Sequence, residues 1–294
     1  MFARRAAPPA ASPDRQKGVR AGATVTDPAP VTEIPAAEKS FVVWYLARIQ
    51  AFCIAELQKI RHDRTELVTR AVQPALWLVI FGQTVSSLHA IPTGNLTYEQ
   101  FLAPGVLAQS GLFVAVFYGI QVIWERDAGV LAKVLTTPTP RGAFVTAKAF
   151  SASVRVFAQA IVVMVLCVIL GIHLIWNPLN LFGAACAVVL GAGFFTTLSM
   201  TLAGLVLSRE RLMGIGQMIT MPLFFASNAL YPVAAMPTWV RVFSRMNPLT
   251  YEVNALRGLL LGTPATLWLD FTVLAGSLVI GIVVSAKVLP RLVR

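Results

Sequence analysis

The side chains that could do chemistry in this sequence are few, and their densest group is a short segment between two long apolar runs. This segment, residues 125–141, reads ERDAGVLAKVLTTPTPR. It begins with two acids that flank an arginine, a pattern suited to charge-assisted hydrogen bonds with another protein. Its two prolines, Pro138 and Pro140, would stop a short helix. We expect a loop that carries a short helix and contacts a partner protein. The alternative is a solvated loop whose charges serve only topology.

The sequence lacks the motifs that usually carry catalysis. It contains no GxxxxGK[ST] phosphate loop, no HExxH, no CxxC and no GxSxG. The three histidines, His62, His89 and His173, stand far apart, so we expect no metal site. Three cysteines are too few for a disulfide framework.

The composition is that of an integral membrane protein. Of the 294 residues, 56% are hydrophobic and 13% are charged, against about 25% charged residues in soluble domains. The mean hydropathy is +0.71. The apolar runs have about the 20 residues that a spanning helix needs, which favours an all-α fold over a barrel. The net charge of +11 fits basic residues on the cytoplasmic side of membrane helices, so we expect no nucleic-acid partner.

Six apolar segments predict six transmembrane helices within a domain that covers residues 67–294. They are approximately residues 67–88, 101–124, 154–176, 179–207, 212–231 and 266–289. The mixed segment 232–264 is too polar to span. There we expect two short helices in the outer leaflet before the last span, near residues 237–246 and 250–261.

The N-terminal part precedes these segments. Residues 1–39 are rich in Ala, Pro and Arg, and we expect a disordered basic tail. Residues 40–66 carry apolar side chains at helical spacing, which predicts an amphipathic helix in the membrane interface. A helix packed on a soluble domain is the alternative. The charged residues of this interface helix include Arg48, Glu56, Lys59, Arg61, Asp63 and Glu66.

The distribution of basic residues predicts the orientation. With both termini in the cytoplasm, all but three of the 24 Lys and Arg residues fall on the cytoplasmic side. The three exceptions are Arg241, Arg245 and Arg257. We therefore expect a multi-pass protein of the plasma (inner) membrane.

The predicted spans contain almost no ionisable residues, which disfavours an ion-coupled secondary transporter. Their polar residues include glutamines of the kind that bond neighbouring helices: Gln73, Gln83, Gln109, Gln121, Gln159 and Gln217. A membrane-embedded lipid-modifying enzyme is a further alternative. Its only outer charged cluster would be Arg241, Glu252, Arg257 and Asp270, which lacks a histidine or an activated nucleophile. Because the chain lacks both a phosphate loop and an obvious ion-coupling site, the energy for transport would come from a separate subunit.

Four stretches resemble the membrane subunit of ABC-2-type exporters, the group of daunorubicin-resistance permeases and of polysaccharide and Nod-factor exporters. They are Gln73-Pro74 with Phe81-Gly82, the YEQFLAPG of residues 98–105, the ERDAG of residues 125–129 with the LTTP of residues 135–138, and the NPLTY of residues 247–251 with Leu256-Arg257. Their order within a six-span pattern is more specific than any one motif. The chain departs from the family loop at Asp127, Val130 and Ala132, and the last of these removes a negative charge.

The resemblance implies a permease subunit that moves an amphipathic or lipid-like substrate, such as a drug, lipid or glycolipid, outward. ATP and Mg²⁺ would bind a separate cytoplasmic ABC ATPase subunit, and this chain would hold no cofactor and no catalytic site. A second permease copy, identical or closely related, and membrane lipids are the other expected partners.

The resemblance also assigns residues to two regions. A coupling helix that docks on the ATPase subunit would involve Glu125, Arg126, Asp127, Gly129, Leu131, Lys133, Leu135, Pro138 and Arg141, with the interface helix beside it. An outer gate would involve Arg241, Arg245, Asn247, Pro248, Tyr251 and Arg257.

Overall fold

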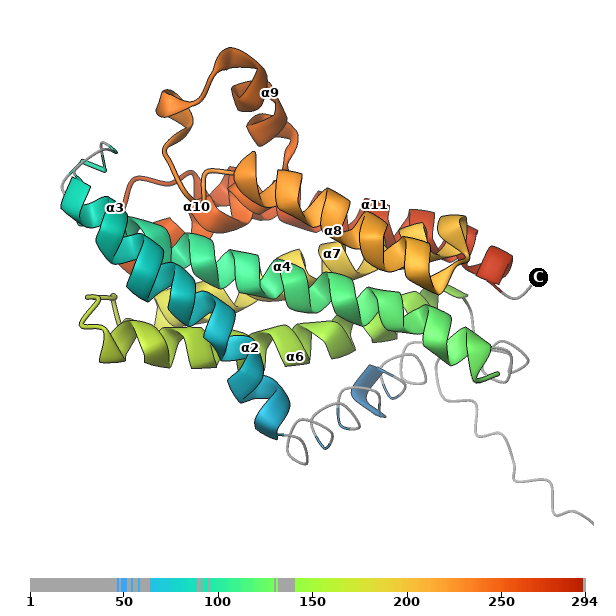
Figure 1. The fold of residues 1–294 in the computed structure, drawn as a ribbon. Helices are drawn as coiled ribbons and strands as arrows, with labels where there is room; N and C mark the ends of the chain where they lie inside the picture. The colour runs from blue at the N-terminus through green and yellow to red at the C-terminus, as the bar shows by residue number, and fades with distance from the viewer. Residues whose placement is uncertain are drawn as a thin grey trace, which may run out of the picture. The chain divides into compact units, whose positions relative to one another are not determined.

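The computed structural model divides the chain into two units, Met1–Ser40 and Phe41–Arg294, and all described residues lie in the second. The described residues are 47, 49–51, 54, 58, 64–88, 91, 93–94, 96–129, 131 and 141–292. Their regular secondary structure is entirely helical (Figure 1), which confirms the predicted class. The basic tail and most of the interface helix, including all its charged residues named above except Glu66, lie outside the described residues.

The first predicted span is a helix with an irregular turn in its middle. It consists of α2 (Arg64–Leu76), the π-helical turn η2 (Trp77–Gly82) and α3 (Gln83–Leu88). Pro74 lies inside α2 and has no N–H to donate to the preceding turn. A π-helical turn is one way in which a helix accommodates such an interruption, and here it follows the proline closely.

Helix α4 (Tyr98–Asp127) lies among the other long helices (Figure 1). It begins at a capping box, in which Thr97 and Gln100 each accept a hydrogen bond from the other's backbone N–H. It contacts α6, α7, α8 and α10, and most of its side chains are buried. A helix enclosed in this way has to be apolar all round, which is the pattern of its sequence.

Helices α6 (Arg141–Ile169) and α7 (Pro178–Val206) pack against α4. The seam between α4 and α7 is close: a Cβ on Gly119 would lie 2.6 Å from the Ser199 Cβ. The Ser199 hydroxyl donates to the Val116 carbonyl across this seam at 2.7 Å. Small residues that let backbones approach and hydroxyls that bond across helices are typical of membrane bundles.

The C-terminal part contains two short helices before the last long one, close to the predicted residues; their place in the outer leaflet stays a prediction. The elements are α8 (Arg209–Phe225), η3 (Val233–Ala235), α9 (Thr238–Met246), α10 (Pro248–Leu261), α11 (Leu267–Val288) and η4 (Leu289–Leu292). Helix α10 packs against α4, α7 and α11. Helix α9 contacts α10 and η3 and projects from the long helices in Figure 1.

Five of the described helical segments are long and apolar enough to cross a membrane: Thr69–Leu88, Tyr98–Asp127, Arg141–Ile169, Pro178–Val206 and Leu267–Leu292. The fifth predicted span, residues 212–231, falls on α8 and the turns after it. Helix α8 has 17 residues, which corresponds to about 26 Å of helix against a hydrocarbon core of about 30 Å. That this segment crosses the membrane therefore stays a prediction.

Helix α6 begins at Arg141, well before residue 154, near which the third span was expected to start. Lys148 and Arg155 are buried in this helix, and their charged groups lie 4.6 and 5.3 Å from the centre of the Tyr118 ring. An aromatic face stabilises a cation inside a bundle, so charge alone did not mark a loop.

Candidate docking site at the end of helix α4

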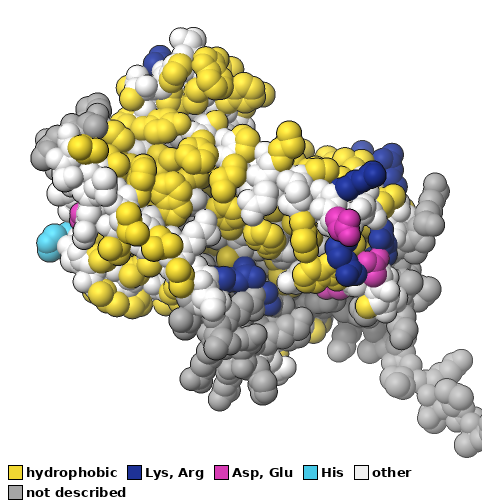
Figure 2. All heavy atoms as spheres, viewed as in Figure 1, with side chains coloured by type: hydrophobic (Ala, Val, Ile, Leu, Met, Phe, Trp, Pro, Cys, Tyr) yellow, Lys and Arg dark blue, Asp and Glu magenta, His cyan; other side chains and the backbone are white. Residues whose placement is uncertain are grey.

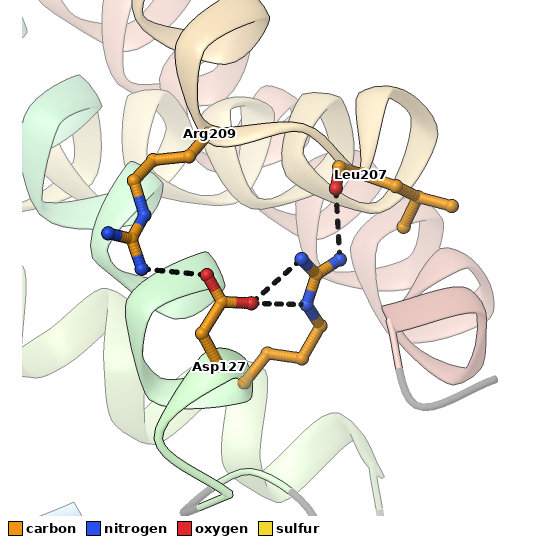
Figure 3. Close-up of polar contacts among 4 residues, drawn as sticks. Asp127, Leu207 and Arg209 are labelled. Atoms are coloured by element: carbon orange, nitrogen blue, oxygen red, sulfur yellow. Dashed lines mark hydrogen bonds and ion pairs between the residues drawn. The ribbon is translucent and has the colours of Figure 1, made fainter. Parts of the chain in front are cut away.

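The last turn of α4 lies beside the start of α8, where the Asp127 carboxylate joins two arginines (Figure 3). One oxygen accepts hydrogen bonds from Arg126 Nε at 3.0 Å and from Arg126 Nη2 at 2.8 Å. The other accepts from Arg209 Nη2 at 2.7 Å. Because one carboxylate faces two guanidinium groups, this Asp127 cluster carries a net positive charge.

The Arg126 guanidinium also reaches the corner between α7 and α8. Its Nη1 donates to the Leu207 carbonyl at 3.1 Å (Figure 3). Leu207 ends α7 in the left-handed conformation, with φ of 56°, where helix-terminal carbonyls need partners from outside the helix. A planar guanidinium can bind a carboxylate along one edge and a carbonyl at its remaining nitrogen, so Arg126 links α4 to the α7–α8 corner.

Glu125 binds in a different direction, toward α6. It forms an ion pair with Lys148, whose side chain is 4% exposed against 32% for Glu125. The three charged residues at the end of α4 therefore contact α6, the α7–α8 corner and α8. In the described structure, all three side chains contact other helices of the same chain. Their contact with another protein stays a prediction.

The rest of the predicted docking set is partly described. Gly129 has φ of 70°, a left-handed conformation that glycine adopts without strain, and it follows the end of α4. Leu131 is buried, whereas Arg141 is exposed at the start of α6. Lys133, Leu135 and Pro138 lie outside the described residues.

Figure 2 shows how this end differs from the surface around it. Basic and acidic side chains gather over the end of α4 and the start of α8, while hydrophobic side chains cover much of the rest of the described face. Exposed apolar residues on long helices, such as Val165, Phe182 and Ile280, are expected where the surrounding solvent is lipid.

The predicted outer-gate residues mostly hold local structure. Arg241 donates to the carbonyls of Ala234 and Met236 at 3.2 and 3.1 Å. Asn247 caps α10 by accepting from the Leu249 N–H at 3.0 Å, in the helix that Pro248 begins. The Tyr251 hydroxyl donates to the Arg245 carbonyl at 2.7 Å.

Arg257 is not at an outer surface, because it is buried between helices. Its Nη2 donates to the carbonyls of Phe101 and Asn228 at 3.1 and 3.0 Å. Its guanidinium lies 3.8 Å from the centre of the Phe101 ring, a cation–π contact. Two backbone acceptors and an aromatic face thus replace the water that a buried guanidinium loses.

The predicted outer cluster of Arg241, Glu252, Arg257 and Asp270 was wrong as an exposed, convergent set. Glu252 and Asp270 are 1% and 2% exposed. The Glu252 carboxylate faces Gly191 of α7, where a Cβ would overlap it, while Arg257 faces α4. Burial raises the pKa of the Glu252 carboxyl well above its ordinary value. Groups that point at different helices do not form the acid–base pair that an enzyme requires.

Two residues of the site, Lys148 and Arg209, could not be assigned to it from the sequence, where they indicate only topology. Arg209 pairs with a residue 82 positions away in sequence, and only the packing of α8 against α4 reveals that pairing. Among the described residues, no group of three or more His, Cys, Asp or Glu could hold a metal ion.

Comparison with known proteins identifies the family. The model of the ABC-2 type transporter family matches residues 47–261. The chain belongs to this family. The match confirms the resemblance inferred from the four motifs, and it covers α2 to α10.

Named relatives extend this finding. The chain is 31% identical over 195 residues to a putative transport permease, ycf38, of Cyanophora paradoxa, covering 65% of this chain and 66% of the relative. It is 26% identical over 204 residues to the daunorubicin resistance ABC transporter permease protein DrrB1 of Streptomyces coeruleorubidus, covering 69% and 71%. It is 26% identical over 200 residues to nodulation protein J of Rhizobium leguminosarum bv. trifolii, covering 67% and 75%. The chain thus spans just under two thirds of the ycf38 relative.

Proposed function

We propose that this chain is the membrane-spanning permease subunit of an ABC exporter, which moves an amphipathic or lipid-like substrate (drug, lipid or glycolipid) outward and is powered by a separate ATPase subunit. One observation carries the proposal: the last turn of α4 binds α6, the α7–α8 corner and α8, directly before the segment that resembles the family's coupling loop. The family match and the printed name of the daunorubicin resistance relative support it.

The contacts at the end of α4 suit the transmission of a displacement. A partner that pushes on residues 128–141 would move α4 together with α6 and α8, because Glu125 and Asp127 tie their ends together. Packed helices then move as rigid bodies. Helix α4 contacts four other long elements, so its displacement would reach the whole bundle.

The ATPase subunit would bind ATP and Mg²⁺, and this chain would supply neither a cofactor site nor catalysis. The partner surface would carry acidic or carbonyl groups, because the Asp127 cluster and the exposed Arg141 present excess positive charge. The Lys and Arg distribution supports a cytoplasmic position for this end of α4 and for both termini, at the plasma (inner) membrane. A second permease copy and membrane lipids would complete the assembly.

Copurification with a phosphate-loop ATPase subunit of an ABC transporter from the same organism tests the proposal. We expect the two proteins to copurify and the chain to stimulate ATP hydrolysis in vesicles. Arg141→Glu should weaken copurification and stimulated hydrolysis about tenfold, because a rim charge that steers a partner is reversed. Arg245→Glu on α9 is the matched charge-reversal control and should leave copurification unchanged. ATP hydrolysis by the purified chain alone, or separate elution of the two proteins, would contradict the proposal.

An ion-coupled secondary transporter gains one observation from the structure. Glu252 and Asp270 are buried, and each has a carboxylate oxygen without a hydrogen-bond partner in the described structure. Buried carboxyl groups inside a membrane protein are candidates for proton binding. Uptake or efflux driven by a pH gradient in vesicles that contain this chain alone, and lost in Glu252→Gln, would establish this second function.

A further inference from the structure

A hollow with several polar side chains in its lining lies between α2, α4, α6 and α8. It borders the middle of α4 and not its charged end. Its volume is about 460 Å³. Gln73, Gln159 and Gln217 line it from α2, α6 and α8, and α4 contributes Ser110 and Phe113 among others. Glutamines from three helices that are far apart in sequence therefore face one space.

Gln159 is the most deeply placed of these residues. It is 1% exposed, and its Nε2 donates to the Arg70 carbonyl at 3.4 Å. Its Oε1 has no hydrogen-bond partner in the described structure. A buried amide oxygen without a partner is costly, and most such groups in native proteins bind something. Gln159 thus holds an unused acceptor at the wall of the hollow.

The rim of the hollow combines polar and adaptable apolar side chains. Gln73 and Gln217 are exposed, and Phe117 and Met221 are 36% and 41% exposed beside them. Lipid chains cannot hydrogen-bond to exposed amides, so this face suits a molecule that has a polar group as well as an apolar part. Methionine adapts its shape to varied ligands.

The charges around the hollow indicate which polar group fits. Among the described lining residues, Arg70 is ionisable and none is acidic. A cationic group would lose its hydration here without gaining a carboxylate partner. The Gln159 oxygen needs a donor, and hydroxyl and amide groups supply one without a charge.

We propose that this hollow binds the polar group of a non-cationic amphipathic molecule with hydroxyl or amide donors, whose apolar part lies against Phe113, Phe117 and Met221. The inference rests on the proposed function, because this molecule would be the exported substrate. It narrows the substrate class from amphipathic molecules in general to those whose polar group donates hydrogen bonds and carries no positive charge.

Photolabelling of the full chain in lipid nanodiscs, without the ATPase subunit, tests the proposal. Two probes share one diazirine-bearing alkyl chain, and one has a glucoside headgroup while the other has a trimethylammonium headgroup. We expect the glucoside probe to label the α4 peptide that contains Phe113 and Phe117 at least about fivefold more than the cationic probe, as the loss of one hydrogen bond would suggest. Gln159→Leu and the rim variant Gln217→Leu should each reduce this labelling. Gln83→Leu, an exposed glutamine of α3, is the matched control.

Equal labelling by both probes, or glucoside labelling that neither Gln159→Leu nor Gln217→Leu reduces, overturns the proposal. A disulfide between two Gln217→Cys copies, together with exclusion of both probes, would show that this face joins two copies and would also overturn it. Because labelling requires no ATPase, these outcomes are independent of copurification. Failed labelling with intact copurification rejects only the assigned substrate class.

Discussion

The end of α4 and the buried face of α10 use the same kinds of side chain in opposite surroundings. At the end of α4, Asp127 lies between Arg126 and Arg209 in an ion-pair network whose side chains are 27% to 50% exposed. On α10, Glu252 and Arg257 are 1% and 8% exposed and bind or face different helices. Water can compete for the ion pairs at the end of α4, whereas the charged groups on α10 are shielded from it.

This difference separates a surface that can change partners from one that holds the fold. Exposed ion pairs contribute little to stability because water competes for them, so their partners can be replaced when another protein docks. A buried charged group that loses its partner leaves an uncompensated charge, and that loss is strongly destabilising. Substitutions in the two regions should therefore affect different measurements.

The largest effect is expected from Arg257→Met. This change removes two charge-assisted hydrogen bonds to backbone carbonyls and the contact with Phe101, and it should cost about 3 kcal/mol of unfolding free energy. Thermal unfolding of the purified protein in detergent measures it. Arg245→Met, on the exposed surface of α9, is the control. A similar melting temperature for both variants would remove the distinction between the regions.

Gly191→Ala should come next. The added Cβ would overlap the Glu252 carboxylate, and overpacking of this kind costs about 1–3 kcal/mol. Gly276→Ala in α11 adds a methyl group where nothing lies within 4 Å, so it should be neutral or slightly stabilising. The same melting experiment distinguishes them. If Gly191→Ala remains as destabilising when Glu252 is also alanine, the overlap is not its cause.

A pH effect should follow from Glu252. Its raised pKa in the folded protein means that folding takes up a proton above the ordinary value of about 4.5. The stability of the wild type should therefore fall as pH rises through the interval between the unfolded and folded pKa values, by about 1.4 kcal/mol per pH unit. Glu252→Gln, which carries no titrating group, should lose this part of the pH dependence. Parallel stability curves for the two proteins between pH 5 and 8 would contradict it.

The smallest effect on stability is expected at the end of α4. Asp127→Asn should leave the melting temperature nearly unchanged, because its ion pairs are exposed. It should still lower the stimulation of the partner subunit's ATP hydrolysis, since the Asp127–Arg209 ion pair between α4 and α8 is lost. Glu210→Gln, beside Arg209, is the control for local charge. A large drop in melting temperature for Asp127→Asn would place this cluster with the structural contacts of α10.

Helix existence could be read from the sequence more readily than helix limits. The two short helices before the last span follow from the mixture of polar and apolar residues there. The second of them ends at Gly262, whose φ is 69°. The start of α6 could not be predicted, because Lys148 and Arg155 look like loop residues until Tyr118 and Glu125 are seen beside them. Helix α8 is shorter than its apolar run because residues after Phe225 turn back, with the Ser227 N–H bonded to the Phe224 carbonyl.

The candidate docking site was only half predictable. Glu125, Arg126 and Asp127 stand together in the sequence, and the family motif points to them. Their partners Lys148 and Arg209 come from other helices, and a buried carboxyl such as Glu252 differs from an exposed one only by what packs around it. A single sequence does not state which distant residues meet.

The sequence by itself determined that this chain is a helical membrane protein of the ABC-2 type transporter family, because apolar length and local motifs are properties of consecutive residues. The tertiary structure decided which charged side chains are buried and which are exposed at the surface. Packing moved Arg257 and Glu252 into the bundle and left Asp127 and Arg141 at its surface, since burial depends on neighbours that only the fold brings together.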